Sequence, residues 1–474
     1  MKTASRLTLV AAVLAASGCA VGPDYRRPTP DLPVAWTLEA PWRTGAPADG
    51  ADKGAWWQAF GDAQLDTLEQ RAMADNPTLA IAAARLAQAR ATVTATSAGL
   101  FPSVSLQSRD QRLRISANRP LANYASPNFS TVQNDFNLGF AASYEVDLAG
   151  RVSRSVEGAR ASAQQSVADL ANTRLVVSAE LASDWFSLVT LDASLAVLDR
   201  SIALQRKALD FVNSRHELGA GTGLEVAQQQ ALLDNTLTQV DVQKRLRAQF
   251  EHAIAALVGA PAPSFSLAPV RRDLQPPAIP VGVPSDLLQR RPDVASAERA
   301  MAVANAQIGV ATAAFYPSVI LAASGGDESR MLSTLFDAPS LVWSIGVSAA
   351  QTLFDAGRTR AGVDFARAGY DASVATYRRT VLAAMQEVED GITGVASLDR
   401  ATAQAQVAVA SAQRVLDMSN ARYEGGVATY LDVITAQQSL LTVQLQATQL
   451  AGQRQLVATA LVKALGGGWG GDVR

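Results

Sequence analysis

The sequence holds few side chains of the kinds that perform catalysis. It has two histidines, His216 and His252, and one cysteine, Cys19. Metal sites of histidine and cysteine, and nucleophiles activated as a cysteine–histidine pair, need more of these residues than the chain has. Counting does not exclude acid–base chemistry by carboxylates, but Asp and Glu fall mostly on helical faces, where solvation explains them. We therefore expect neither an enzyme nor a bound cofactor or metal.

The single cysteine ends a stretch with the features of an export signal. Lys2 and Arg6 frame a charged start, an apolar run extends from Leu7 to Ala16, and Ser17-Gly18 precede Cys19. An exported chain could use cysteines in pairs, so a single one at this place indicates another role. Ala16-Ser17-Gly18-Cys19 resembles the bacterial lipoprotein box. That resemblance implies a diacylglycerol and an N-acyl chain on Cys19; the alternative is an ordinary signal with a chance cysteine.

Charge and composition further limit the class of protein to which this chain can belong. Without Lys2 and Arg6, the 41 basic residues become 39 against 43 acidic ones, a balance of minus four that gives no footprint for nucleic acid. Apolar residues make up 48% of the chain, which is ample for a core. Beyond the signal, no segment is expected to be a membrane helix. The nearest, Met301 to Gly326, has no charge but is interrupted by Pro317.

One pattern of about 200 residues occurs twice, a unit longer than those of solenoids and propellers. Pro77 and Pro102 lie 25 residues apart, and so do Pro292 and Pro317 at an offset of 215. Further on the offset is 207, which pairs Gly150 with Gly357, Arg215 with Arg422, and Gly219 with Gly426. The chain therefore looks like a duplicated half-structure. Its expected segments are a signal at 1–18, an N-terminal segment at 19–62, repeat 1 at 63–259, a proline-rich linker at 260–284, repeat 2 at 285–466 and a tail at 467–474.

Each repeat contains a stretch with the period of a β-strand. One face is apolar in both stretches, with Phe136, Leu138, Phe140, Ala142, Tyr144 and Val146 in the first and Leu341, Trp343, Ile345, Val347 and Ala349 in the second. Partner strands beginning at Ser103 and Ser318 give hairpins at about 102–147 and 317–355, with loops at 110–133 and 327–339. Strands of about 9 to 11 residues with lipid on one face build outer-membrane barrels.

Four strands cannot close such a barrel, because open edges are not tolerated in lipid. If the strands span a membrane, several copies of the chain must share one barrel. The alternative from alternation alone is a soluble sheet packed on helices.

Very long helices follow the strands in each repeat. Between Arg151 and Arg215 there is no proline and one internal glycine, Gly158, so the segment could form a rod of about 95 Å. Leucines and isoleucines recur every seven residues, which is coiled-coil spacing, at Leu181, Leu188, Leu195, Ile202 and Leu209. Shorter returning helices are expected at Leu224–Val258 and Leu431–Leu465. Each repeat is thus a strand hairpin joined to a tall helical hairpin.

The turn between the helices contains glycines that allow a tight reversal. Two carboxylates, Glu225 and Asp432, then fall in the first turn of the returning helix, where they meet the positive end of the helix dipole. Helix capping alone would explain both.

Taken together, these features resemble the TolC-like outer-membrane factors, and within them the lipid-anchored OprM or NodT type of efflux channel. The residues that carry the resemblance are Cys19 with Val21-Gly22-Pro23-Asp24-Tyr25, Trp56-Trp57 to Leu65, Tyr144 to Arg151, Phe354 to Arg358, and Arg422-Tyr423 through Asp432-Val433. The resemblance implies a homotrimer in the outer membrane, with a shared 12-stranded β-barrel and a periplasmic tube of helices.

The same resemblance implies partners and cargo. A periplasmic adaptor and an RND-type inner-membrane transporter would deliver drugs or other small toxic compounds to the channel. The alternatives are the duct of an ABC-type protein secretion system, and a lipid-anchored coiled-coil scaffold that never spans the membrane.

Roles at the hairpin tips also follow from the resemblance. Asp432 corresponds to a gate aspartate, Glu225 to a tip carboxylate, Tyr423 to the tip tyrosine and Leu431 to the apolar residue of the constriction. A second gate aspartate is replaced by Thr435 and a tip arginine by Ala428, so the second acidic ring and that ion pair are not expected. The positions expected to meet the adaptor are Arg215, Gly219, Arg422, Gly426 and Val427.

Overall fold

A computed structural model describes residues 20–26, 54–118, 131–270, 276–277, 279 and 291–467. The chain forms two compact units, and each unit contains parts of both repeats. The first comprises the described residues of 1–28, 86–166 and 297–377, and the second those of 29–85, 167–296 and 378–474.

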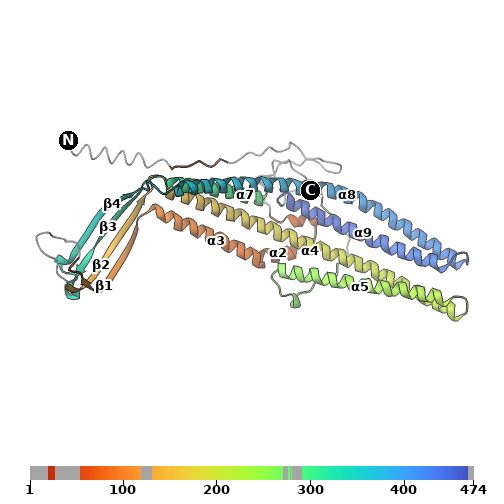
Figure 1. Cartoon of the computed structure of the whole chain (residues 1–474). Helices are drawn as coiled ribbons and strands as arrows, with labels where there is room; N and C mark the ends of the chain where they lie inside the picture. Colours follow the sequence, from red (N-terminus) through yellow and green to blue (C-terminus); the bar gives the residue numbers. More distant parts are fainter. Residues whose placement is uncertain are drawn as a thin grey trace. The chain divides into compact units, whose positions relative to one another are not determined.

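A four-stranded antiparallel sheet forms much of the first unit (Figure 1). Its strands lie in chain order, β1 Ser103–Ile115, β2 Thr131–Val146, β3 Ser318–Ser329 and β4 Leu341–Ala350. The two predicted hairpins are joined through β2 and β3, where Phe140 lies opposite Gly325. Repeat 1 and repeat 2 therefore share one continuous sheet, whose outer strands are β1 and β4.

The expected loop at 110–133 is wrong in its extent. Strand β1 continues to Ile115, which pairs with Thr131 at the start of β2. Polar side chains support this extension, since Arg109 lies 3.0 Å from Asp135 and Gln111 donates to the same carboxylate at 2.9 Å. Strand β3 likewise runs to Ser329, three residues into the loop expected at 327–339. Apolar alternation could not reveal these strand ends, because cross-strand polar pairs sustain the ladder there.

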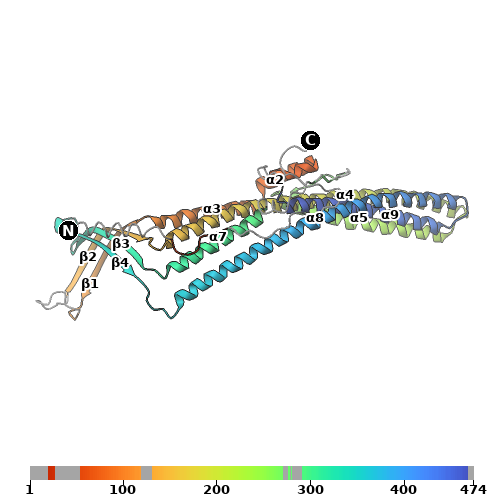
Figure 2. The same ribbon diagram turned by 90° about the horizontal axis from the view of Figure 1, so that it is seen from above.

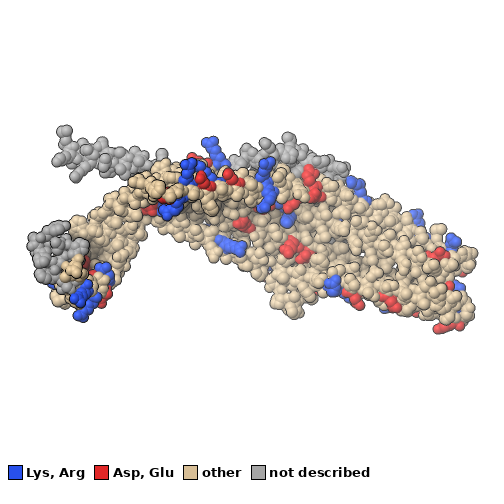
Figure 3. Space-filling model, viewed as in Figure 1, with Lys and Arg blue, Asp and Glu red and all other residues tan. Residues whose placement is uncertain are grey.

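One face of the sheet is apolar and exposed. The side chains of Trp343, Ile345 and Val347 are 73%, 79% and 70% exposed, and Leu106 and Phe140 are more than half exposed. In Figure 3 charged residues gather near one end of the strands, and the visible surface between the strand ends is nearly free of charge. A soluble sheet packed on helices would bury these residues, so that alternative does not fit.

The rods and the returning helices are those that the sequence predicts, with ends shifted by one or two residues. The two rods, α4 Arg151–Glu217 and α8 Arg358–Glu424, have 67 residues each, and so extend about 100 Å. They are preceded by α2 Ala63–Asp75 with α3 Pro77–Ser97, and by α7 Pro292–Ala313, respectively. The returning helices are α5 Gly223–Leu257 and α9 Tyr430–Ala464. Within the second unit α5 lies beside α4 and α9 beside α8 (Figures 1 and 2).

The second unit has the larger core. Leu181, Leu188, Trp185 and Phe186 of α4 are buried there with residues of α2, α8 and α9. Asp62 caps α2 and accepts a hydrogen bond of 2.7 Å from Trp185 Nε1. By length and composition α4 contains a stretch that could cross a membrane, but 56% of that stretch is buried, as in the core helix of a soluble protein.

Candidate functional site: the tips of the helical hairpins

The first tip is a tight reversal built around Gly219. The N–H of Gly219 donates to the carbonyl of His216 at 2.9 Å, and that of Ala220 to the carbonyl of Arg215 at 2.8 Å. These bonds satisfy carbonyls at the end of α4, and they require the positive φ of 72° that Gly219 adopts. The Arg215 side chain strengthens the turn by donating to the Ala220 carbonyl at 2.9 Å.

The second tip repeats this geometry at the 207-residue offset. Gly426 has the same φ of 72° and donates to the Tyr423 carbonyl at 3.0 Å, while Val427 donates to that of Arg422 at 3.0 Å. The glycines expected to meet an adaptor are thus also required by the backbone.

Both candidate gate carboxylates cap the returning helices. Glu225 accepts from the Thr222 N–H at 3.2 Å, and Asp432 accepts from the N–H and the hydroxyl of Thr429, each at 3.0 Å. These are the carboxylate halves of capping boxes at the positive ends of α5 and α9. The capping role is therefore present in the structure. It leaves Asp432 exposed, together with Leu431, which is 56% exposed.

A cation–π contact joins the two tips within one chain. The guanidinium carbon of Arg215 lies 4.9 Å from the centroid of the Tyr423 ring, which itself lies 5.1 Å from the ring of Tyr430. Burial raises the pKa of the Tyr423 phenol, and the negative charge of Glu225 adds to the effect. The structure thus brings together Arg215, Tyr423 and Glu225, which the sequence had divided between adaptor contact and gate.

Beneath this contact lies a buried polar chain that sequence analysis missed. The Tyr430 hydroxyl donates to Gln229 Oε1 at 2.8 Å, and Gln229 Nε2 donates to the Gln205 carbonyl at 3.0 Å. Gln229 is fully buried and connects α4, α5 and α9. A signal existed in the sequence, because Gln229 occupies the apolar face of α5 between Val226 and Leu233.

The remaining tip residues are open to solvent. Val427 is 68% exposed, Arg422 is exposed, and two apolar neighbours that the sequence did not single out, Leu218 and Leu224, are 84% and 66% exposed. A solvent-facing apolar surface at the end of a helical hairpin suits contact with another protein. Cys19 lies outside the described residues. Within the described ranges, no three acidic, histidine or cysteine side chains are placed to hold a metal ion.

An exposed apolar sheet and paired coiled-coil rods with glycine turns define a channel-type membrane protein. The model of the family described as outer membrane efflux protein matches residues 68–260 and 283–467. The chain therefore belongs to the outer membrane efflux protein family, and it is an outer-membrane efflux channel. This membership favours the channel over the scaffold that never spans the membrane.

Individual relatives agree over almost the whole length. The pyoverdine export outer membrane protein OpmQ of Pseudomonas aeruginosa is 31% identical, over 98% of this chain and 97% of its own. The cation efflux system protein CusC of Escherichia coli is 29% identical, over 96% of this chain and 97% of its own. Among solved structures, the open state of the MtrE outer membrane channel of Neisseria gonorrhoeae gives a TM-score of 0.81 at 26% identity. It covers 95% of this chain and 98% of its own.

Proposed function

We propose that three copies of this chain form one passive exit duct in the outer membrane, with a shared barrel of 12 strands. The observation that carries the proposal is the sheet itself, which has four strands with an exposed apolar face and ends at β1 and β4. Each unsatisfied backbone group in hydrocarbon costs several kcal/mol, so these edges must be paired in a membrane. Pairing β1 of one copy with β4 of the next satisfies both edges.

Cysteine crosslinking tests the shared barrel directly. One cysteine replaces Gln107 in β1, and a series of single cysteines is placed along β4, in a background with serine at position 19. Membranes treated with oxidant should yield covalent dimers and trimers for one register of the β4 series. The same experiment with paired cysteines in β2 and β3 should yield only monomers, since those strands pair within one chain. A monodisperse monomer from the membrane fraction would overturn the proposal.

The duct would serve a tripartite pump for small compounds. The exposed tip residues Leu218, Leu224 and Val427 favour docking of a periplasmic adaptor, which would connect the channel to an RND-type inner-membrane transporter. Relatives named for pyoverdine, toluene, antibiotic and cation export support small cargo. Deletion of the gene should raise sensitivity to toxic compounds. Restoration by a wild-type copy but not by Val427→Asp, assembled at equal abundance, would assign the tip to adaptor contact.

Lipid attachment to Cys19 is a separate proposal, supported by the signal that precedes it. Globomycin should cause an unprocessed precursor to accumulate, and radiolabelled palmitate should label the wild type. Persistent labelling of Cys19→Ser would refute the assignment. Because the barrel also holds the protein in the membrane, this variant should lose only part of its function.

A further inference from the structure

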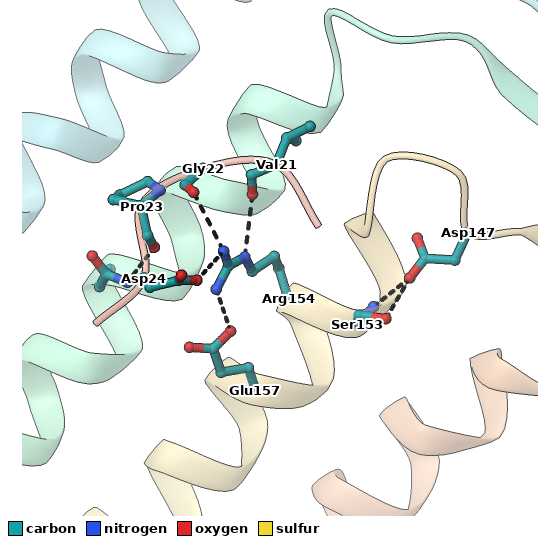
Figure 4. Close-up of polar contacts among 9 residues, drawn as sticks. Val21, Gly22, Pro23, Asp24, Asp147, Ser153, Arg154 and Glu157 are labelled. Atoms are coloured by element: carbon teal, nitrogen blue, oxygen red, sulfur yellow. Dashed lines mark hydrogen bonds and ion pairs between the residues drawn. The ribbon is translucent and has the colours of Figure 1, made fainter. Parts of the chain in front are cut away.

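The first described residues of the chain lie against α4 and α7 (Figure 4). Val21 N–H donates to the Ala149 carbonyl at 3.1 Å, and Asn305 Nδ2 of α7 donates to the Pro23 carbonyl at 2.9 Å. The segment 20–26, which we call the N-terminal strap, therefore contacts repeat 1 and repeat 2 together. All of these residues belong to the first compact unit.

Arg154 is the centre of the strap's binding site. Its guanidinium donates to the carbonyls of Val21 and Gly22 at 3.2 and 3.3 Å, and it pairs with Asp24 at 2.9 Å and Glu157 at 2.7 Å. The side chain is only 6% exposed. With the strap in place each of the three guanidinium nitrogens has an acceptor, so the charge is buried with its hydrogen bonds met; without the strap, Glu157 alone among these acceptors would remain. The strap thus completes the hydrogen bonding of the Arg154 guanidinium.

Glycines allow the strap to approach this closely. Gly22 has a φ of +97°, and a Cβ there would lie 2.6 Å from the Gly309 Cα of α7. On the side of repeat 1, a Cβ on Gly150 would lie 2.5 Å from the Ala20 Cα. The backbone of the strap therefore touches the backbone of α7 at Gly22 and the backbone before α4 at Gly150, and only glycine permits contacts this close.

The far end of the strap is held by α7. Tyr25 donates its hydroxyl proton to Glu298 Oε1 at 2.6 Å, and Glu298 is 3% exposed. The Arg299 guanidinium lies 5.9 Å from the centre of the Tyr25 ring. Glu298, Asn305 and Gly309 are spaced by seven and four residues, so they lie along one face of α7.

We propose that the strap is a rigid mount that staples α4 to α7 at the base of the sheet and fixes the position of the membrane anchor. The anchoring part of this proposal rests on the lipid proposed for Cys19. Consecutive Cα atoms are about 3.8 Å apart, so a lipid on Cys19 starts one residue from docked Ala20. Ala149, which receives the strap, is three residues beyond Val146, the last residue of β2. Lipid and strand would therefore enter the membrane at one level, with no flexible tether between them.

The test uses Gly22→Ala, which introduces both a clash and a strained φ into the strap. Gly357→Ala is the matched control, because its φ is +89° but a Cβ there meets nothing within 4 Å. Hydrogen exchange of the detergent-purified full-length protein should show peptide 20–26 protected in the wild type and in the control. In Gly22→Ala the exchange should become at least about tenfold faster. The first turn of α4 should also exchange faster, and the oligomer should dissociate at a lower temperature.

Two results would overturn the mount: a wild-type strap that exchanges like a free peptide, or a Gly22→Ala protein whose α4 and oligomer are unchanged. Should Gly22→Ala not accumulate, Asp24→Ala gives the same reading, because it removes one acceptor of Arg154 without a clash. Running both variants with an ordinary cleavable signal and serine at position 19 separates the proposals. Palmitate labelling that is absent from the wild type, or that persists with serine at position 19, would refute the lipid, whereas a strap that is unprotected with Gly22 and Asp24 intact would refute the mount in either background.

Discussion

The Tyr430 hydroxyl lies 2.8 Å from Gln229 Oε1, in a bond that connects the second helical hairpin to the first beneath the tips. Both residues are buried, with Tyr430 4% and Gln229 0% exposed. A bond of this kind is costly to break, because its acceptor has no water to replace the lost partner.

Tyr430→Phe should therefore destabilise the tip by about 1 to 3 kcal/mol, the cost of leaving a buried acceptor unpaired. The double variant Tyr430→Phe/Gln229→Leu should cost less than the sum of the two single changes. Thermal unfolding followed by circular dichroism would measure the cycle. Strict additivity would show that the bond contributes no coupling. In planar bilayers the single variant should also conduct more than the wild type, if the two hairpins separate when the channel opens.

Asp432 can be tested for a role beyond capping. Asp432→Asn retains a carbonyl oxygen that can accept from Thr429 but loses the charge, whereas Asp432→Ala loses both. If Asp432 lines a narrow acidic ring, both variants should lower cation preference and weaken block by multivalent cations in bilayers. Only Asp432→Ala should also cost about 0.5 to 2 kcal/mol of stability. Unchanged selectivity in both would leave Asp432 a capping residue.

Leu431→Ala should raise the conductance, because a shorter side chain would widen an apolar constriction. The matched change is Leu224→Ala, at the equivalent place in repeat 1, which is 66% exposed against 56% for Leu431. An equal effect of both variants would contradict a special role of Leu431 in the constriction.

The helices and strands followed from sequence periodicity because their apolar faces are continuous. The row containing Leu181 and Leu188 is buried, and the strand residues Trp343 and Ile345 share one exposed face. What periodicity missed were polar contacts made across the fold. The extension of β1 past Asp110 depends on cross-strand pairs, and Arg154 reaches a strap about 130 residues away in the sequence. Neither contact leaves a local pattern.

At the tips, the sequence located the turns but not the contacts between them. Gly219 and Gly426 are visible because a reversal requires positive φ. The contact of Arg215 with Tyr423 joins residues from different repeats, and its geometry depends on how the hairpins pack. Repeat symmetry alone shows only that Arg215 and Arg422 are equivalent positions, and it does not indicate a contact between Arg215 and Tyr423.

The lipid-facing side of the sheet predicts an asymmetric response to charge. Ile345 is 79% exposed and pairs with Ala323 near the middle of β3. Ile345→Arg should therefore cost about 2 to 4 kcal/mol if it lies at the bilayer midplane. Its neighbour on the opposite face, Ser344→Arg, is the control and should assemble normally. Reconstitution into lipid with a denaturant titration would compare them, and equal costs would contradict the assignment of the two faces.

Glu69 is a buried carboxyl of α2 in the core of the second unit. It is fully buried, and a hydrogen bond from the neighbouring Ser178 hydroxyl, which favours the ionised form, does not offset the effect of burial. Burial raises the pKa of the Glu69 carboxyl from 4.5 to about 9, and the nearby Asp66 carboxylate adds to the shift. The folded protein therefore holds this proton between pH 4.5 and 9, where the unfolded chain releases it. Its contribution to stability is complete below pH 4.5 and is lost as the pH rises through about 9.

Glu69→Gln should remove this dependence, because an amide keeps the shape of the protonated acid without titrating. Unfolding midpoints measured between pH 5 and pH 9, about the two ends of that range, should fall for the wild type and stay more nearly level for the variant. Above neutral pH the variant should be the more stable protein. Asp75→Asn, an exposed change on the same helix, should follow the wild type. If Glu69→Gln instead parallels the wild type across this range, the carboxyl is not the group that takes up the proton on folding.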